Sequence, residues 1–362
     1  MNPIAKINLN SLRKNIIYLK SLINSADLIP IIKANAYGHG YVEVLKILKN
    51  QNLECVGIAT VSELKEIINE KLNIDILHLG KIDFNYLDYY LDKHVIATIN
   101  TYKDVVFLKN SLKKYKTVRV HVKVDSGMHR MGCSLNDLDK IIKEIKNTSN
   151  IILEGIYSHL ACSEDPLAKH NKVQISIFND IIRKYKLDSV RFHLINSGGV
   201  FNYKECCFDF VRAGLSIFGV SSNQIINKKL SSVMELIAPV VLIKEVFKGD
   251  KIGYGCTYTV DKKMRIAMLQ CGYADGIPYR FGNRGFVFFK NKKLPILGKI
   301  SMDLICIDCS EASSLSEKDY VTIWGGDMQE SKLENISKRF GDIPYIYLTR
   351  LSSRVERVYI DE

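Results

Sequence analysis

The 362-residue chain is 47% hydrophobic and 25% charged, a balance that supports a large core and argues against an intrinsically disordered protein. Its net charge is +12, but the lysines are scattered among acidic and apolar residues, so we expect a solvated basic surface and no nucleic-acid partner. No run approaches the ~18 consecutive apolar residues of a membrane-spanning helix and the N-terminus shows no secretory signal, so we expect a cytoplasmic protein that does not enter a membrane.

Short apolar segments alternate with amphipathic segments through the first two-thirds of the chain. The predicted strands are Leu28–Lys33, Glu54–Ala59, Asp75–Leu79, Val95–Ile99, Val118–Val124, Ile152–Ser158, Val190–Ile195 and Phe210–Phe218. Apolar residues recur every three or four positions in the segments between them, which predicts helices at Val42–Leu48, Val61–Ile68, Leu135–Ile145 and Val173–Tyr185.

Repeated strand–helix units predict a parallel sheet with helical crossovers. Eight such strands favour an α/β fold of the closed (β/α)8 type, the TIM barrel, and a doubly wound open sheet is the alternative. In the barrel, functional residues are expected at the carboxyl ends of strands. Residues at, near or just past such predicted ends include Lys33, Arg130, His159, Ser197 and Gly214.

The last third of the chain changes character and reads as strands joined by short turns. The predicted strands are Ala238–Val246, Arg265–Leu269, Phe286–Phe289, Leu294–Leu297 and Tyr320–Trp324, and only Lys332–Phe340 is clearly helical. We therefore expect a barrel domain over residues 1–233 and a mainly β domain over residues 234–362, with the first few residues able to pair with the β domain.

The nine cysteines are an odd number, and two of them, Cys206 and Cys207, are adjacent. This distribution indicates reduced thiols and not a disulfide framework. Cys306 and Cys309 have C-x-x-C spacing, but no second pair completes a zinc site. We interpret them as strand residues and expect no metal.

Lys33 is the first candidate catalytic residue, because lysine is rarely buried and this one closes an apolar strand. A lysine at the mouth of a barrel is well placed to form a Schiff base, since burial lowers the pKa of an amine and makes it nucleophilic. A lysine that merely marks the exit of a strand into solvent is the alternative.

Motifs along nearly the whole chain decide between these two interpretations. KANAYGHG, which starts at Lys33, closely resembles the pyridoxal 5'-phosphate lysine motif of the alanine racemase family. The resemblance continues in the order expected for the family, through HVKVDSGMHRMG at His121, SHLACSED at Ser158, HLINSGG at His193, DFVRAGLSIFG at Asp209, IGYGCTY at Ile252, CGYADGIP at Cys271, GKISMD at Gly298 and LSSRVERV at Leu351.

The resemblance implies an enzyme that interconverts L- and D-alanine and supplies D-alanine for peptidoglycan. Pyridoxal phosphate acts as an electron sink for the carbanion that forms when the α-proton leaves. By resemblance, Lys33 holds the cofactor covalently and then serves as the base on one face of the α-carbon, while Tyr254 is the base on the opposite face. Tyrosine has an ordinary pKa of ~10, so Tyr254 needs a neighbouring cation to act.

The resemblance also implies how the cofactor ring is held. His159 lies near the tyrosine and connects to Arg212, which contacts the pyridine nitrogen. Arginine stays charged and cannot protonate the ring, which favours racemisation over transamination. An amino-acid decarboxylase on the same barrel type would pair this nitrogen with an acid, so Arg212 argues against that alternative.

The phosphate of the cofactor requires hydrogen-bond donors. By resemblance these come from Tyr37, Ser197 and the backbone at Gly214 and Leu215. The short polar stretch from Asn196 to Gly199 suits the approach of backbone N–H groups to an anion.

Further residues are implied to hold the substrate. Arg130 orients the carboxylate and the phenolic oxygen of the cofactor, and Met302 contributes its backbone N–H to the carboxylate, with Asp303 beside it. Lys123 matches a lysine that is carbamylated in some members of the family. A cofactor-carrying barrel protein of vitamin-B6 homeostasis is a non-enzyme alternative, but such proteins lack a second domain with Tyr254 and Met302.

Two expectations concern specificity and assembly. Ser353 stands where the family often has a tyrosine that touches the phosphate and narrows the substrate pocket, so a broader-specificity racemase, for example of serine, is the alternative function. In the family the lysine and tyrosine meet across a head-to-tail homodimer, which implies active sites shared between two chains.

Overall fold

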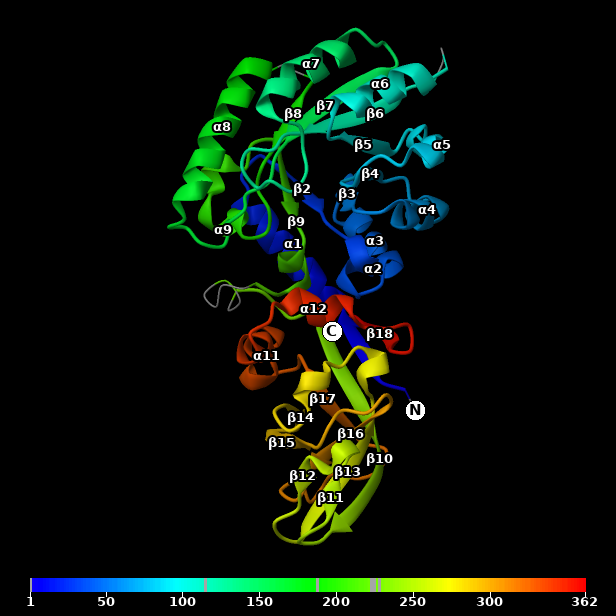
Figure 1. The fold of residues 1–362 in the computed structure, drawn as a ribbon, viewed down its shortest axis with the longest axis vertical. Coiled ribbons are helices and arrows are strands. Elements are labelled where there is room, and N and C mark those ends of the chain that lie inside the picture. The colour runs from blue at the N-terminus through cyan, green and yellow to red at the C-terminus, as the bar shows by residue number, and fades with distance from the viewer. Residues whose placement is uncertain (1, 114–115, 187–188, 222–225, 227–228) are drawn as a thin grey trace. The chain divides into compact units, whose positions relative to one another are not determined.

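The structure is a computed structural model that describes residues 2–113, 116–186, 189–221, 226 and 229–362. The chain divides into two compact units. One contains residues 13–36 and 41–217, and the other contains residues 1–12, 37–40 and 218–362. We call them the barrel unit and the β unit (Figure 1).

Among its described residues, the barrel unit contains eight parallel strands. They are β2 (Asp27–Pro30), β3 (Cys55–Ile58), β4 (Asp75–His78), β5 (Val95–Ile99), β6 (Val118–Lys123), β7 (Ile151–Tyr157), β8 (Arg191–His193) and β9 (Phe210–Ala213). Strands β3 to β8 pair in sequence order, and β2 pairs with β9. Parallel bridges between Ile31 and Gly57 and between Asn196 and Arg212 join these two sheets into a ring. The predicted (β/α)8 barrel is therefore confirmed, and the open-sheet alternative is excluded.

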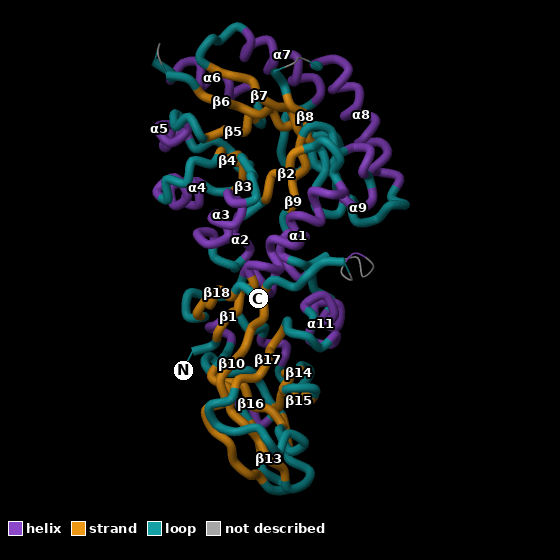
Figure 2. The backbone as a smooth tube through the Cα atoms, turned by 180° about the vertical axis from the view of Figure 1, so that it is seen from behind, coloured by secondary structure: helices purple, strands orange, loops and turns teal. Residues whose placement is uncertain are grey.

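The helices of the barrel unit lie around the outside of its strands (Figure 2). They are α3 (Tyr41–Asn50), α4 (Val61–Asn69), α5 (Leu87–Tyr90), α6 (Tyr102–Ser111), α7 (Leu135–Lys146), α8 (Lys169–Tyr185) and α9 (Gly199–Asn202), with α1 (Leu9–Leu22) and α2 (Lys33–Tyr37) crossing into the β unit. Every residue of β5 is buried, as expected for a parallel strand covered on both sides. In α7 the buried residues are Leu138, Ile141, Ile142 and Ile145, which follow the predicted helical spacing.

The β unit is built on a long strand, β10 (Met234–Val246). This strand closes a ring with β13 (Met264–Gln270), β16 (Leu304–Asp308), β15 (Lys292–Leu297), β14 (Phe286–Phe289) and β17 (Tyr320–Trp324), and all these pairings are antiparallel. The N-terminal strand β1 (Ile4–Asn8) pairs with β10 and with β18 (Glu356–Ile360). The unit also contains β11 (Lys251–Ile252) and β12 (Tyr258–Thr259), which pair with each other, and the helices α11 (Leu333–Phe340) and α12 (Pro344–Thr349). The predicted mainly β second domain is confirmed, whereas its boundary at residue 233 stays a prediction.

Several elements differ from the sequence predictions. The strand predicted to run to Phe218 ends at Ala213, because the N–H of Gly214 donates to the Ser197 hydroxyl instead of to a strand and a 3-10 turn follows at Leu215–Phe218. The helix α12 was missed, although a proline at its first position is typical of a helix start. Helices α1 and α6 were also missed.

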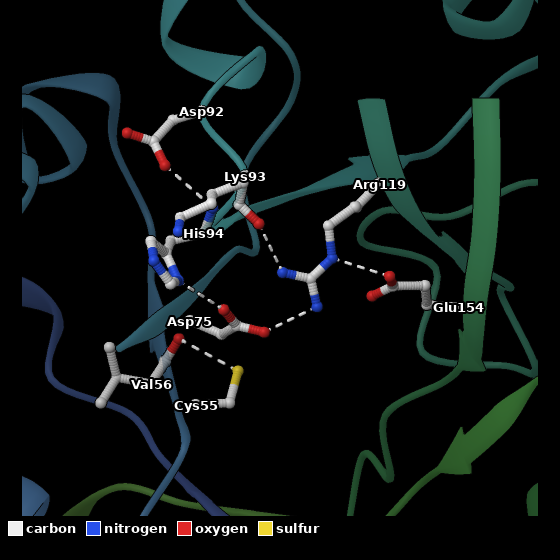
Figure 3. Close-up of polar contacts among 8 residues, drawn as sticks. All are labelled: Cys55, Val56, Asp75, Asp92, Lys93, His94, Arg119 and Glu154. Carbon is white, nitrogen blue, oxygen red and sulfur yellow. Dashed lines mark hydrogen bonds and ion pairs between the residues drawn. The ribbon is translucent and has the colours of Figure 1, made fainter. Parts of the chain in front are cut away.

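Ion pairs join three strands of the barrel, β4, β6 and β7, near their amino ends (Figure 3). Arg119 of β6 lies between Asp75 of β4 and Glu154 of β7, with nitrogen–oxygen distances of 2.6 and 2.7 Å. Asp75 also contacts His94 Nδ1 at 3.0 Å. Each charge in this network has an opposite charge beside it. Within the described residues, no helix is long and apolar enough to cross a bilayer.

Candidate active site

Lys33 follows β2 at the carboxyl end of the barrel. The strand ends at Pro30, three residues earlier than predicted, and Lys33 begins a turn instead of closing the strand. In this turn the φ angles of residues 34–37 are all +53°, a left-handed conformation that costs non-glycine residues energy. The Glu63 carboxylate stabilises the turn, because it accepts the N–H of Ala34 at 2.7 Å.

The Lys33 amine has a perturbed proton affinity. Burial lowers the pKa of Lys33, the positive charge of Arg130 lowers it further, and the negative charge of Glu63 raises it. A lowered pKa leaves more of the amine unprotonated near neutral pH, which is the form that can act as a nucleophile or a base.

Four cations gather at this end of the barrel. Lys123 is buried at the end of β6, and burial together with Arg130, Arg212 and Lys33 lowers its pKa to about 8. Burial holds the pKa of His159 well below its ordinary value, and the positive charges of the same cations, of which Arg212 has the largest effect, lower it further. This imidazole is therefore neutral. Such a concentration of positive charge is suited to an anionic ligand.

Arg212 is the most deeply buried of the four, with 3% of its surface exposed. Its guanidinium donates to the backbone oxygens of Ser158 at 2.5 Å and of Leu194 at 3.1 Å. Its Nη2 lies 3.3 Å from His159 Nδ1. Burial lowers the pKa of Arg212 to about 10, so the group remains charged at neutral pH.

A pair of buried histidines lies behind Arg212. His193 Nδ1 is 2.6 Å from Arg212 Nη1, and His193 Nε2 is 2.9 Å from His121 Nδ1. A guanidinium has no acceptor, so His193 accepts at Nδ1 and carries its proton on Nε2. The two histidines therefore fix the orientation of Arg212, a role that the sequence motifs containing them did not indicate.

The Ser197 segment lies between β8 and β9. Ser197 Oγ accepts the N–H of Gly214 at 2.9 Å. Asn196 Oδ1 accepts the N–H of Gly199 at 3.2 Å, and Asn196 Nδ2 lies 3.3 Å from His159 Nε2. Leu215 follows directly and begins a 3-10 turn. The segment thus places the Asn196 amide beside His159 and holds the start of the 3-10 turn through the Ser197 hydroxyl.

The remaining predicted site residues belong to the β unit. Tyr37 is buried against the rings of Phe218 and Tyr345, at centroid distances of 5.4 and 5.8 Å. Tyr254 has 72% of its surface exposed and stands between Gly253 and Gly255, which both have positive φ angles.

Met302 and its neighbour Asp303 lie in a turn between β15 and β16. Met302 is 52% exposed, and Ser353 in the turn before β18 is also exposed. The structure therefore brings Lys33, Arg130, His159, Asn196, Ser197, Arg212, Gly214 and Leu215 together within one unit, and it places Tyr37, Tyr254, Met302 and Asp303 on the other.

Comparisons with known proteins give the family. The profile described as "Alanine racemase, N-terminal domain" matches residues 7–222, and the profile for the C-terminal domain matches residues 233–359. The chain belongs to the alanine racemase family. The resemblance in the sequence motifs is confirmed.

Individual members of the alanine racemase family match over nearly their whole length. The alanine racemase of Vesicomyosocius okutanii is 30% identical over 355 residues, which is 98% of each chain. The structure of the alanine racemase of Clostridium difficile 630 superposes with a TM-score of 0.92 at 28% identity, covering 100% of this chain and 96% of that one. The Bartonella henselae alanine racemase, crystallised with covalently bound pyridoxal phosphate, gives a TM-score of 0.89 at 27% identity, covering 99% of this chain and 100% of that one.

Proposed function

We propose that this protein is a pyridoxal-phosphate-dependent enzyme that interconverts L- and D-alanine and supplies D-alanine for the cell wall. The observation that supports this most strongly is the half-buried amine of Lys33, whose pKa is lowered, beside three further cations at the carboxyl end of a barrel. Membership of the alanine racemase family specifies the reaction.

The residues at the barrel end fit pyridoxal phosphate. The cofactor is an anion that requires an amine for covalent attachment, and when bound it supplies an electron sink that makes the α-proton of an amino acid acidic. Lys33 would attach it, and the phosphate would meet Ser197, Tyr37 and the backbone at Gly214 and Leu215. Arg130, His159, Asn196 and Arg212 would hold the ring and its oxygen.

The identity of Arg212 favours racemisation over other reactions of this cofactor. Its guanidinium stays charged, donates hydrogen bonds and releases no proton at neutral pH, so it leaves a ring nitrogen unprotonated. The hydrogen bond to His193 keeps it aimed in one direction. This arrangement limits loss of carbon dioxide or amino transfer, which benefit from an acid at the same position.

Two side chains would move the α-proton. The Lys33 amine would take or return it on one face of the α-carbon, and the Tyr254 phenol would do so on the other face. Arg130 and the N–H of Met302, with Asp303 beside it, would hold the substrate carboxylate between them.

We further propose that the enzyme is a homodimer in which Tyr254 of one copy completes the barrel site of the other. The high exposure of Tyr254 and Met302 supports this, because a proton-transferring phenol and a carboxylate-binding turn require protection from bulk water. The cytoplasm is the proposed compartment, and the nine free thiols support it, since a reducing environment keeps cysteines unpaired.

The test combines spectroscopy with a racemisation assay. The purified protein should show absorbance of covalently bound cofactor, and it should convert L-alanine to D-alanine, measured by chiral chromatography. Lys33→Ala should abolish both the absorbance and the activity, whereas Tyr254→Phe should abolish only the activity. Absence of D-alanine formation by the cofactor-loaded wild-type enzyme would refute the proposal.

Mixing the two inactive variants tests the shared site. A mixed dimer of Lys33→Ala and Tyr254→Phe chains contains one intact pair of Lys33 and Tyr254. Co-expression of differently tagged chains should therefore restore about a quarter to a half of the activity per dimer. Complete inactivity of the purified mixed dimer would show that each site is built from one chain.

Ser353 supports a second candidate, a racemase with broader specificity. Its exposed, short side chain stands where the family often has tyrosine, so it leaves more room beside the substrate. We expect turnover of serine as well as alanine, and Ser353→Tyr should lower the serine-to-alanine ratio of kcat/KM by about tenfold. An unchanged ratio would contradict this second candidate.

A further inference from the structure

Three turns of the β unit meet around Gly272. The turn containing Met302 is held by backbone hydrogen bonds from Tyr273 N–H to Ser301 O and from Ala274 N–H to Met302 O, both 3.1 Å long. The approach is so close that a Cβ atom on Gly272 would lie 2.2 Å from Met302 O. The position of the Met302 turn therefore depends on the turn at Gly272–Gly276.

Asp275 organises this second turn from a buried position. Its side chain is 1% exposed, and its Oδ2 accepts the N–H of Gly272 at 2.8 Å. Its Oδ1 lies 3.1 Å from Nε of Arg354, which belongs to the third turn, directly after Ser353. A buried carboxylate requires such a countercharge, since an uncompensated charge in a low-dielectric interior is costly.

The guanidinium of Arg354 also contacts the Met302 turn itself. Its Nη2 donates to Asp303 Oδ1 at 2.6 Å. One arginine thus binds a carboxylate on each of the two turns that form the surface around Met302. The contact with Asp275 holds the Gly272–Gly276 turn, to which the Met302 turn is hydrogen-bonded. The contact with Asp303 holds the Met302 turn directly.

The charge of Asp303 matters because of what lies beside it. The N–H of Met302 has no hydrogen-bond acceptor among the residues that the structure describes, and the residue is half exposed, so this N–H is available to a ligand. A free Asp303 carboxylate one residue away would repel a second carboxylate. The hydrogen bond with Arg354 neutralises it and holds it to one side.

We propose that Arg354 is a positioning residue that makes the Met302 turn able to accept the substrate carboxylate. This inference rests on the proposed function, because it assigns the approaching anion to the amino-acid substrate. Arg354 acts through Asp275 and Asp303, without touching the substrate itself. It lowers the cost of bringing a carboxylate to Met302 and leaves the groups that move the α-proton unchanged.

Propanoate is the probe for this inference, since it is alanine without the amino group and carries the carboxylate alone. Its dissociation constant is measured on the cofactor-loaded enzyme, from the change in cofactor absorbance and from competitive inhibition. We expect Arg354→Met to weaken propanoate binding and raise KM for alanine by about tenfold, with kcat changed by less than about twofold, because one partly screened charge near the carboxylate is left uncompensated.

Neutralising the acids separates charge from mere loss of structure. In the triple variant with Arg354→Met, Asp303→Asn and Asp275→Asn, propanoate binding should recover most of the lost affinity, because the repelling carboxylate is gone and no uncompensated charge stays buried at position 275. Asp303→Asn alone should change binding by less than about threefold. Recovery is not expected if Arg354→Met had only disordered the turns.

Arg350→Met is the matched control, because Arg350 is exposed and lies four residues before Arg354 in the chain. The substitution removes the same charge and the same side chain from a nearby position. This variant should bind propanoate like the wild type. Wild-type affinity in Arg354→Met, or failure of the two neutralising substitutions to restore binding to it, would overturn the inference. A wild-type enzyme that binds the cofactor but does not racemise alanine would instead refute the proposed function.

Discussion

The two ends of the barrel treat positive charge in opposite ways. Near the amino ends of the strands, Arg119 is held between Asp75 and Glu154 (Figure 3). Burial opposes the charge of Arg119, but its hydrogen bonds to the two acids outweigh burial and raise its pKa. At the carboxyl ends, burial and the neighbouring cations lower the pKa of Lys33 and of Lys123.

This difference separates structural from functional charge in one fold. A cation with its acids beside it is already satisfied and contributes to stability, whereas a group of cations with mutually lowered pKa values destabilises the empty barrel. The carboxyl end, where the cations gather, is therefore the end that a bound anion stabilises. The comparison predicts that removing a cation from each end will have opposite effects on stability.

The largest effect is expected from Arg119→Met, near the amino ends of the strands, where each charge is paired with an opposite one. It leaves the partly buried carboxylates of Asp75 and Glu154 without their shared cation, so we expect the free energy of unfolding to fall by about 2–4 kcal/mol. Urea unfolding of the protein measures this loss, and racemisation per folded molecule should stay at the wild-type level.

Neutralising both acids controls for the loss of packing by the arginine. The triple variant with Asp75→Asn, Glu154→Gln and Arg119→Met should regain part of the stability, because no uncompensated charge remains. A stability equal to wild type in Arg119→Met alone would show that the network is only a surface feature.

The opposite sign is expected for Lys123→Met at the cationic end. The pKa of Lys123 is lowered from 10.5 to about 8, so below pH 8 the folded chain bears the full cost of this charge. Between pH 8 and 10.5 only the unfolded chain binds the proton, and wild-type stability rises with pH. The variant without cofactor should therefore be more stable than wild type by about 1–3 kcal/mol at pH 7, with the gain vanishing above pH 10.5.

The same variant should lose activity, by about tenfold, since Lys123 contributes to the field that holds an anionic cofactor.

If Lys123 is carbamylated, ¹³C-bicarbonate should give a carbamate NMR signal that disappears in Lys123→Met. Destabilisation by Lys123→Met at pH 7, as large as that of Arg119→Met, would remove the distinction between the two ends.

The sequence identified the residues that carry motifs and missed those that act through contacts. Lys33 and Arg212 stand in motifs within the range that the N-terminal family profile matches, and their catalytic roles stay predictions. Glu63 lies in the helix predicted over Val61–Ile68 but received no predicted role, and only the T-x-x-E spacing with Thr60 signals that it caps this helix. His193 stands in a motif but received no predicted role. Its contact with Arg212 joins two neighbouring strands, and neither motif alone indicates such a contact.

Local conformation was the least predictable property. The left-handed turn at residues 34–37 contains two alanines and a tyrosine, residue types that do not indicate such a turn. Its conformation comes from contacts elsewhere in the chain, such as the bond from Ala34 N–H to Glu63. The barrel itself was predictable because eight apolar strands recur with amphipathic helices between several of them, and such periodicity survives errors of a few residues at each end.

The smallest effect is expected from Glu63→Gln. Glu63 is an acid at the cationic end of the barrel that both holds the turn after Lys33 and raises the pKa of Lys33. The Glu63 carboxylate accepts N–H groups of Ala34, Ala59 and Thr60 at 2.7–3.0 Å, and its charge raises the pKa of Lys33. A glutamine offers one acceptor oxygen and no charge, so the variant should lose about 1 kcal/mol of stability. The pKa of Lys33, followed by NMR of ¹³C-labelled lysine in the cofactor-free protein, should fall. Glu66→Gln, the same change on the exposed face of α4, should leave Lys33 unchanged. A Lys33 titration that is identical in Glu63→Gln and wild type would mean that the acid holds the turn without tuning the amine.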